Sequence, residues 1–259
     1  MPARTITLLT DFGLRDHFVG VMKGVIASIA PAARIVDITH EIGSYQIFQA
    51  RFLLAQSWPY FAKRTIHVAI VDPGVGSARR PILVEAAGHL FVGPDNGIFS
   101  ALIQRDDARV RHITNARLFR QPVSSTFHGR DIFAPVAAHL ACGVPPSRTG
   151  PRIQDALFDP LTGPIRTGKR TWSATVVHID HFGNVITNLP VDEFAKMRFL
   201  LRIGPAEIVE RAANYAAIAP GALAIVEASH GCLEIAAAQA SAASKLKVAP
   251  GAPVELETF

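Results

Sequence analysis

Two turns early in the chain carry side chains that could bind or activate a small polar molecule. The first is Thr10-Asp11-Phe12-Gly13, followed by Asp16, and the second is VDPGVGSARRP at 71–81, which contains Asp72 and Arg79. A carboxylate at a strand end commonly binds ribose or other vicinal hydroxyls, and the glycines of the second turn permit close approach to the backbone. Each turn has a structural alternative, because Asp11 suits a helix N-cap and the second turn suits a Pro-Gly turn with solvated arginines.

A third turn places an aromatic ring beside an amide. In IDHFGNVITN, residues 179–188, Asp180, Phe182 and Asn184 fall close together. Such a pair suits a purine, because the ring stacks on the base and the amide hydrogen-bonds to its edge. The alternative is a β-turn that contains asparagine.

Two further segments offer histidines. His128 lies in TFHGRDIFAP at 126–135, just ahead of a predicted helix, and Ser229-His230 lies between two predicted strands. Histidine exchanges a proton near neutral pH, although a single histidine is also a common structural residue. The sequence contains no HExxH, paired His-x-His, P-loop, GxSxG or GxGxxG pattern, so we expect no metal and no cofactor.

Hydrophobic periodicity predicts the elements that position the early turns. The predicted strands are 5–9, 34–38, 65–71, 82–85 and 90–92, and the predicted helices are 17–31, 45–58 and about 131–141. The strand at 65–71 is almost wholly apolar, as expected for a parallel strand buried on both faces. Alternation of strands and helices predicts an α/β domain.

The pattern changes after residue 143. Proline and glycine recur between 143 and 168 without periodicity, which is typical of a linker. Beyond them we predict strands at 173–179, 200–203, 223–227, 233–236 and 254–256, and short helices near 192–197 and 240–246. Closely spaced strands are typical of a β-sandwich or barrel. We therefore expect a sandwich-like α/β domain over 1–145, a linker at 146–170 and a smaller, mostly β, barrel-like domain over 171–259.

Composition excludes several classes of protein. Hydrophobic residues make up 49% and charged residues 18% of the chain, which excludes a disordered protein and indicates apolar surface buried between subunits. No stretch approaches the roughly 18 apolar residues of a membrane span. The net charge is +5, but the basic residues are scattered, which argues against nucleic acid and favours small anions. Cys142 and Cys232 lack zinc-type spacing, and no export signal is evident, so we expect a cytoplasmic protein with reduced thiols.

Six motifs in order resemble the S-adenosylmethionine hydroxide adenosyltransferases, relatives of enzymes that fluorinate or chlorinate the same substrate. They are TDFGLRDHFVGVMKG, VDPGVGSARRP, GPDNGIFS, TFHGRDIFAP, DHFGNVITN and the late Ser229. The resemblance implies an α/β domain followed by a β domain, and a homotrimer that binds substrate between the N-terminal domain of one subunit and the C-terminal domain of the next. It also implies attack of water or hydroxide at ribose C5′ of S-adenosyl-L-methionine, which yields adenosine and L-methionine.

The resemblance also implies roles for individual residues. The family's hydrolases carry a catalytic trio that matches Asp72, Arg79 and His128 here. On this basis we expect Asp72 to orient His128, His128 to deprotonate or polarise water, and Arg79 to hold that water. The residues expected to bind substrate are Asp11 at the ribose, Phe182 and Asn184 at the adenine, and Asp16, Asp180, Ser229 and His230 at the methionine end.

Two alternatives remain at this level. A halogenating enzyme would form 5′-halo-5′-deoxyadenosine, but Asp72 and His128 differ from the halogenases, and residues 80–94 leave no room for the fluorinase insertion. A non-catalytic sensor of S-adenosylmethionine or adenosine is the other alternative. A sensor does not require a base and an arginine near C5′, so the trio argues against it.

Overall fold

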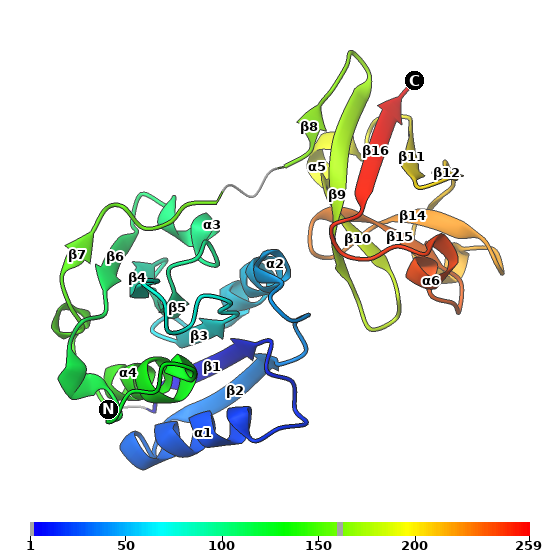
Figure 1. Cartoon of the computed structure of the whole chain (residues 1–259). Coiled ribbons are helices and arrows are strands. Elements are labelled where there is room, and N and C mark those ends of the chain that lie inside the picture. The colour runs from blue at the N-terminus through cyan, green and yellow to red at the C-terminus, as the bar shows by residue number, and fades with distance from the viewer. Residues whose placement is uncertain (1–2, 160–162) are drawn as a thin grey trace. The chain divides into compact units, whose positions relative to one another are not determined.

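The computed structural model describes residues 3–159 and 163–259 and divides the chain into two compact units, Met1–Pro160 and Leu161–Phe259 (Figure 1). The segment predicted as a linker, 146–170, is partly structured. It contributes the 3-10 turn η4 (Pro146–Arg148) and strand β7 (Arg152–Ile153) to the first unit, and strand β8 (Ile165–Arg166) to the second. Residues 160–162 of that predicted linker lie outside the described residues.

The first unit is built on a sheet with the strand order β2-β1-β3-β5-β4-β6-β7. The strands not yet delimited are β1 (Thr5–Thr10), β2 (Arg34–Thr39), β3 (Ile66–Ile70), β4 (Pro81–Ala86), β5 (His89–Pro94) and β6 (Arg109–His112). β1 pairs parallel with β2 and β3, and β3 pairs parallel with β5. β4 is antiparallel to both β5 and β6. Consequently β1, β2, β3, β5 and β6 run in one direction, and their carboxyl ends lie along one edge.

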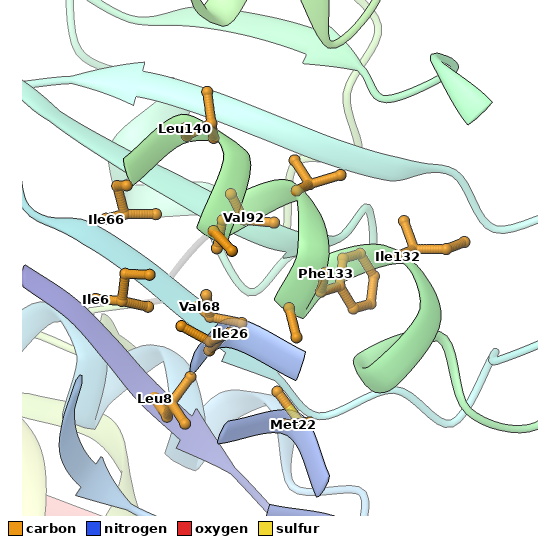
Figure 2. Packing of buried hydrophobic residues seen from close by; sticks show 14 of the residues in the cluster. Ile6, Leu8, Met22, Ile26, Ile66, Val68, Val92, Ile132, Phe133 and Leu140 are labelled. Carbon is orange, nitrogen blue, oxygen red and sulfur yellow. The ribbon is translucent and has the colours of Figure 1, made fainter. Parts of the chain in front are cut away.

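Helices cover both faces of this sheet. α1 (Phe18–Ile29), the π-helical turn η3 (Gly129–Phe133) and α4 (Ala134–Ala141) pack on one face. Figure 2 shows Met22 and Ile26 of α1, together with Phe133, among the sheet residues. A second cluster of buried side chains includes residues of α2 (Ile47–Ser57) and α3 (Ser100–Ile103). The remaining 3-10 turns are η1 (Trp58–Tyr60) and η2 (Ala116–Leu118). The predicted α/β class is thereby confirmed.

The second unit is mostly β. Its sheet order is β12-β11-β16-β9-β10-β15-β14-β13, with β8 beside β9. The elements are β9 (Thr171–Ile179), β10 (Val185–Pro190), α5 (Val191–Phe194), β11 (Phe199–Ile203), β12 (Ala206–Ile208), β13 (Arg211–Ala212), η5 (Tyr215–Ala217), β14 (Leu223–Glu227), β15 (Cys232–Ala237), α6 (Ala242–Leu246) and β16 (Pro253–Thr258). The first half of β9 pairs with β16, while its second half pairs with β10. This change of partner along one strand lets the sheet enclose its own apolar core.

Two local features differ from expectation. The sequence predicts one helix from about 131 to 141, but the chain enters α4 through the π-helical turn η3. The sequence predicts only a turn at 179–188, but β10 begins within that segment at Val185 and runs to Pro190. In the described part of the chain, no helix combines the length and apolarity needed to cross a bilayer.

Candidate active site

The three predicted catalytic side chains meet in the first unit. Asp72 follows the carboxyl end of β3, Arg79 precedes β4, and His128 immediately precedes η3. Arg79 Nε donates to Asp72 Oδ1 at 3.0 Å, and Arg79 Nη2 pairs with Asp72 Oδ2. The same Nη2 lies 3.0 Å from His128 Nδ1. The guanidinium therefore joins the carboxylate to the imidazole.

This geometry differs from the expected division of roles within the trio. Asp72 was expected to orient His128, but Arg79 makes the contact with the imidazole. A guanidinium has no acceptor, so His128 Nδ1 must accept this hydrogen bond. The proton of the neutral ring is then on Nε2. Burial and the charge of Arg79 lower the pKa of His128, which favours the neutral form at pH 7.

Arg79 also retains an unused donor. Its side chain is only 7% exposed and that of Asp72 only 5%. Within the described residues, the buried Arg79 Nη1 has no hydrogen-bonding partner. Burial raises the pKa of Asp72, although the paired guanidinium opposes that shift. Because buried polar groups are almost always hydrogen-bonded, an unsatisfied nitrogen within this trio points to a ligand atom.

A cavity of about 150 Å³ adjoins the trio. Asp72 and His128 line it, together with the rings of Phe12, Phe18 and Phe127. The centroid of the Phe18 ring is 6.0 Å from that of Phe12 and 5.3 Å from that of Phe127. The wall is therefore largely apolar, with polar groups concentrated at the trio. An apolar wall of this kind strengthens electrostatic interactions at the trio.

Asp131 holds the His128 loop, and sequence reasoning did not single it out. Its side chain is fully buried and accepts hydrogen bonds from Arg130 Nε at 2.7 Å and from the Ser124 amide at 2.9 Å. Arg120 Nη1 adds a third contact at 3.3 Å. The available signal was an acid three residues after His128 in the motif TFHGRDIFAP, but its partners are set by folding.

The two catalytic loops also touch directly. Gly76 has φ +77°, and a Cβ added there would lie 2.2 Å from the backbone oxygen of Ser125. Only glycine permits that approach. The loop that carries Arg79 and the loop that carries His128 are therefore positioned against each other.

The predicted ribose ligand lies at the same edge of the sheet. Asp11 directly follows β1, which runs parallel to β3, so Asp11 and Asp72 follow neighbouring strand ends. Asp11 Oδ2 accepts a hydrogen bond from the Tyr45 amide at 3.0 Å, and its side chain remains partly exposed. Asp16 lies farther along the loop and is exposed.

In the second unit, Asp180 organises the turn between β9 and β10. Its Oδ1 accepts from the amides of Phe182 at 3.0 Å and Asn184 at 2.8 Å, and its Oδ2 accepts from Asn184 Nδ2 at 2.9 Å. Asn184 is 5% exposed, whereas Phe182 is 75% exposed. Since Asn184 Nδ2 binds Asp180, Oδ1 of Asn184 is available as an acceptor for an exocyclic amino group.

This turn borders a cavity of about 570 Å³ in the second unit. Phe182 and Asn184 line it with Tyr215, Gln239 and Ser241. The last three were not predicted from the sequence. Tyr215 is fixed through its hydroxyl, which donates to Glu234 Oε1 at 2.6 Å. Two exposed aromatic rings that line one cavity are typical of a site for a flat heterocycle.

His230 follows Ser229 in the turn between β14 and β15. Its Nε2 lies 3.4 Å from Oε2 of Glu234, which is 2% exposed. Burial disfavours the imidazolium, but Cys232 and Glu234 outweigh it and raise the pKa of His230 to about 9. His230 is therefore a cation at neutral pH. Ser229 is exposed. Within the described residues, no group of three acidic, histidine or cysteine side chains is arranged to hold a metal ion.

The fold and these motifs define a member of the SAM hydroxide adenosyltransferase family. The N-terminal domain of that family matches residues 6–150, and its C-terminal domain matches residues 174–255. The chain is 38% identical to an (R)-S-adenosyl-L-methionine hydrolase of Salinispora tropica, over 96% of each chain. It is also similar to an uncharacterized conserved protein of Thermotoga maritima, with a TM-score of 0.89 and 36% identity over 97% of this chain and 99% of that one. A fluorinase of an Actinoplanes species is more distant, with 24% identity over 73% of this chain and 74% of its own.

Proposed function

We propose that this protein hydrolyses S-adenosyl-L-methionine to adenosine and L-methionine. The observation that carries the proposal is the buried, unsatisfied Nη1 of Arg79 beside His128. This nitrogen can donate to the oxygen atom of a water molecule, whereas the Nε2–H of His128 points away from the guanidinium. The greater similarity to (R)-S-adenosyl-L-methionine hydrolases than to fluorinases supports the same reaction.

The unsatisfied donor of Arg79 acts on the nucleophile. Its positive charge stabilises hydroxide more than water, and so it lowers the pKa of the bound water molecule. Asp72 holds the guanidinium in place and accepts two of its hydrogen bonds. Neutral His128 accepts from Arg79 at Nδ1 and already carries its proton on Nε2, so it holds the guanidinium and does not act as the base. The proton lost by water passes to solvent.

The bond changes are those of a substitution at carbon. The hydroxide oxygen forms a bond to ribose C5′, the C5′–S bond breaks, and its electron pair neutralises the sulfonium. Methionine leaves as a neutral thioether, so no acid is required. Attack of an anion on a cation annihilates charge, which an apolar cavity lined by Phe12, Phe18 and Phe127 favours.

The proposed substrate contacts use both units. Asp11 accepts from the ribose hydroxyls, Phe182 stacks on adenine, and Asn184 accepts from its amino group. Ser229 and the cationic His230 face the methionine carboxylate, with Asp16 as a further polar contact at that end. Asp180 acts mainly by holding Phe182 and Asn184 in their turn. The proposal includes no cofactor and no metal, and assigns the protein to the cytoplasm.

A product assay tests the reaction. The purified protein is incubated with S-adenosyl-L-methionine, with and without excess chloride, and the products are separated by chromatography. We expect equimolar adenosine and methionine at a rate that chloride does not change. A chlorinated nucleoside would instead identify a halogenase. Heat stabilisation by the substrate without any product would identify a binding protein.

We further propose a homotrimer in which each active site combines the trio of one subunit with the adenine site of the next. The 49% hydrophobic composition supports buried surface between subunits. Co-expression of Arg79→Lys and Asn184→Ala chains, each inactive alone, should restore about a quarter of the wild-type sites in randomly mixed rings. Light scattering measures the mass. A monomeric mass, or mixed chains without activity, would contradict this arrangement.

A further inference from the structure

A second cavity of the first unit belongs to neither proposed substrate site. Its volume is about 300 Å³. The charged and polar residues that line it are Arg4, Arg64, Glu85, His89, Asp107 and Arg109.

This cavity lies at the opposite end of the sheet from the trio. Arg4 immediately precedes β1, Arg64 precedes β3 by two residues, His89 opens β5 and Arg109 opens β6. These four strands run in the same direction. Their amino ends therefore bring the basic side chains together, whereas the turns with Asp11 and Asp72 follow the carboxyl ends.

The charges around the cavity are unbalanced. Its two acids already have cationic partners: Glu85 accepts from Arg111 Nε at 3.2 Å, and Asp107 accepts from Arg105 Nε at 3.0 Å. By contrast, the guanidinium groups of Arg64 and Arg109 make no ion pair within residues 3–159 and 163–259.

Arg4 adds a third guanidinium. It donates only to the backbone oxygen of Leu140, at 2.8 Å. Partial burial and the nearby charge of Arg64 both lower the pKa of Arg4. Two neighbouring cations repel each other, and an anion in the cavity would relieve that repulsion.

His89 provides a buried polar group in the wall. It is 4% exposed, and its Nδ1 is 3.1 Å from Nε2 of the fully buried His67. His67 Nδ1 in turn lies 2.8 Å from Thr7 Oγ1. These buried hydrogen bonds fix the His89 ring. Among the described residues, His89 Nε2 has no hydrogen-bonding partner.

We propose that this cavity binds a phosphate group, either as inorganic phosphate or as a phosphate monoester. Guanidinium groups match the oxygens of a tetrahedral dianion in charge and geometry. His89 Nε2–H completes the donor set, while His89 Nδ1 keeps its hydrogen bond to His67. A volume of about 300 Å³ exceeds that of phosphate alone, so a small group attached to the phosphate also fits.

Calorimetry and imidazole NMR test this site on the full chain at constant ionic strength. Inorganic phosphate and ribose 5-phosphate serve as probes, and chloride serves as the monoanion control. We expect both phosphates to bind and to shift the His89 resonances. If the natural ligand is a phosphorylated metabolite, ribose 5-phosphate should bind more tightly than inorganic phosphate. If the natural ligand is inorganic phosphate, the order should be reversed. The double variant Arg64→Gln/Arg109→Gln should weaken binding at least about 10-fold.

Arg198→Gln is the matched control, because it removes an exposed positive charge in the second unit. It should leave phosphate binding unchanged. Three results would overturn the proposal: no phosphate binding to the wild-type chain, an equal effect of chloride on His89, or undiminished binding in a folded Arg64→Gln/Arg109→Gln variant. The melting temperature of each variant establishes that it is folded.

Discussion

Replacement of Arg79 by lysine is expected to lower kcat for S-adenosyl-L-methionine hydrolysis by about 100- to 1,000-fold, the usual effect of removing a donor that stabilises developing charge. Lysine keeps the positive charge but not the planar fork that contacts Asp72, His128 and one further atom together. Steady-state kinetics measure the change. KM should change little, since the proposed contacts of Arg79 are to the nucleophile and not to the nucleoside.

Arg80→Lys is the control for this variant. Arg80 is adjacent in sequence, but its guanidinium pairs with Asp95 and Asp155 rather than with the trio. We expect kcat within about threefold of wild type, because Arg80 contacts neither Asp72 nor His128. If Arg79→Lys retained kcat as Arg80→Lys does, the proposed bridging role of Arg79 would be wrong.

Replacement of Asp131 by asparagine is expected to lower the free energy of unfolding by about 3 kcal/mol, as when one partner of a buried ion pair is removed. The fully buried carboxylate accepts hydrogen bonds from Arg130, Arg120 and the Ser124 amide. Asparagine offers one acceptor oxygen and no charge. Because these contacts hold the loop that precedes His128, kcat should fall as well. Thermal and urea unfolding measure the stability.

The pH dependence separates charge from packing at Asp131. Burial would raise the pKa of Asp131, but its contacts with Arg130 and Ser124 outweigh burial and lower it. A lowered pKa stabilises the fold above the unfolded-state value of about 4. That contribution disappears as the pH falls through the folded-state pKa. The wild-type chain and Asp131→Asn should therefore converge in stability in acid.

Asp106→Asn provides the matched control, because Asp106 is exposed in a surface turn. It should change neither the unfolding free energy nor its acid dependence by more than about 0.5 kcal/mol. A constant stability difference between wild type and Asp131→Asn across the acid range would show that packing alone is involved.

The regular elements with strong periodicity were predictable. The apolar run 65–71 became β3, parallel to both neighbours, and the segment 17–31 contains α1. Each of these elements is defined by the pattern of buried residues along a short segment, and that pattern can be read from the local sequence. The strand β10 was not predictable because Thr187 and Asn188 interrupt its apolar residues and it ends at Pro190, so the segment lacks a clear strand pattern.

The contacts within the sites were less predictable. The motifs identify Asp72, Arg79 and His128, but they do not reveal that the Arg79 side chain lies between the other two. His128 is 49 residues from Arg79 in sequence, and only folding decides which donor reaches which acceptor. Tyr215 and the basic cavity at the amino edge were missed for the same reason. Their side chains have no common periodicity and come together through sheet order.

The close approach of Gly76 to Ser125 has a consequence for protein engineering. Since the backbone oxygen of Ser125 occupies the space that a side chain at residue 76 would need, neither loop can be lengthened or reshaped alone without displacing the other. A library that randomises only the segment 71–81 would mostly yield chains in which the loop that carries His128 is displaced from the nucleophile site. New nucleophiles are therefore best sought by exchanging both loops as one cassette.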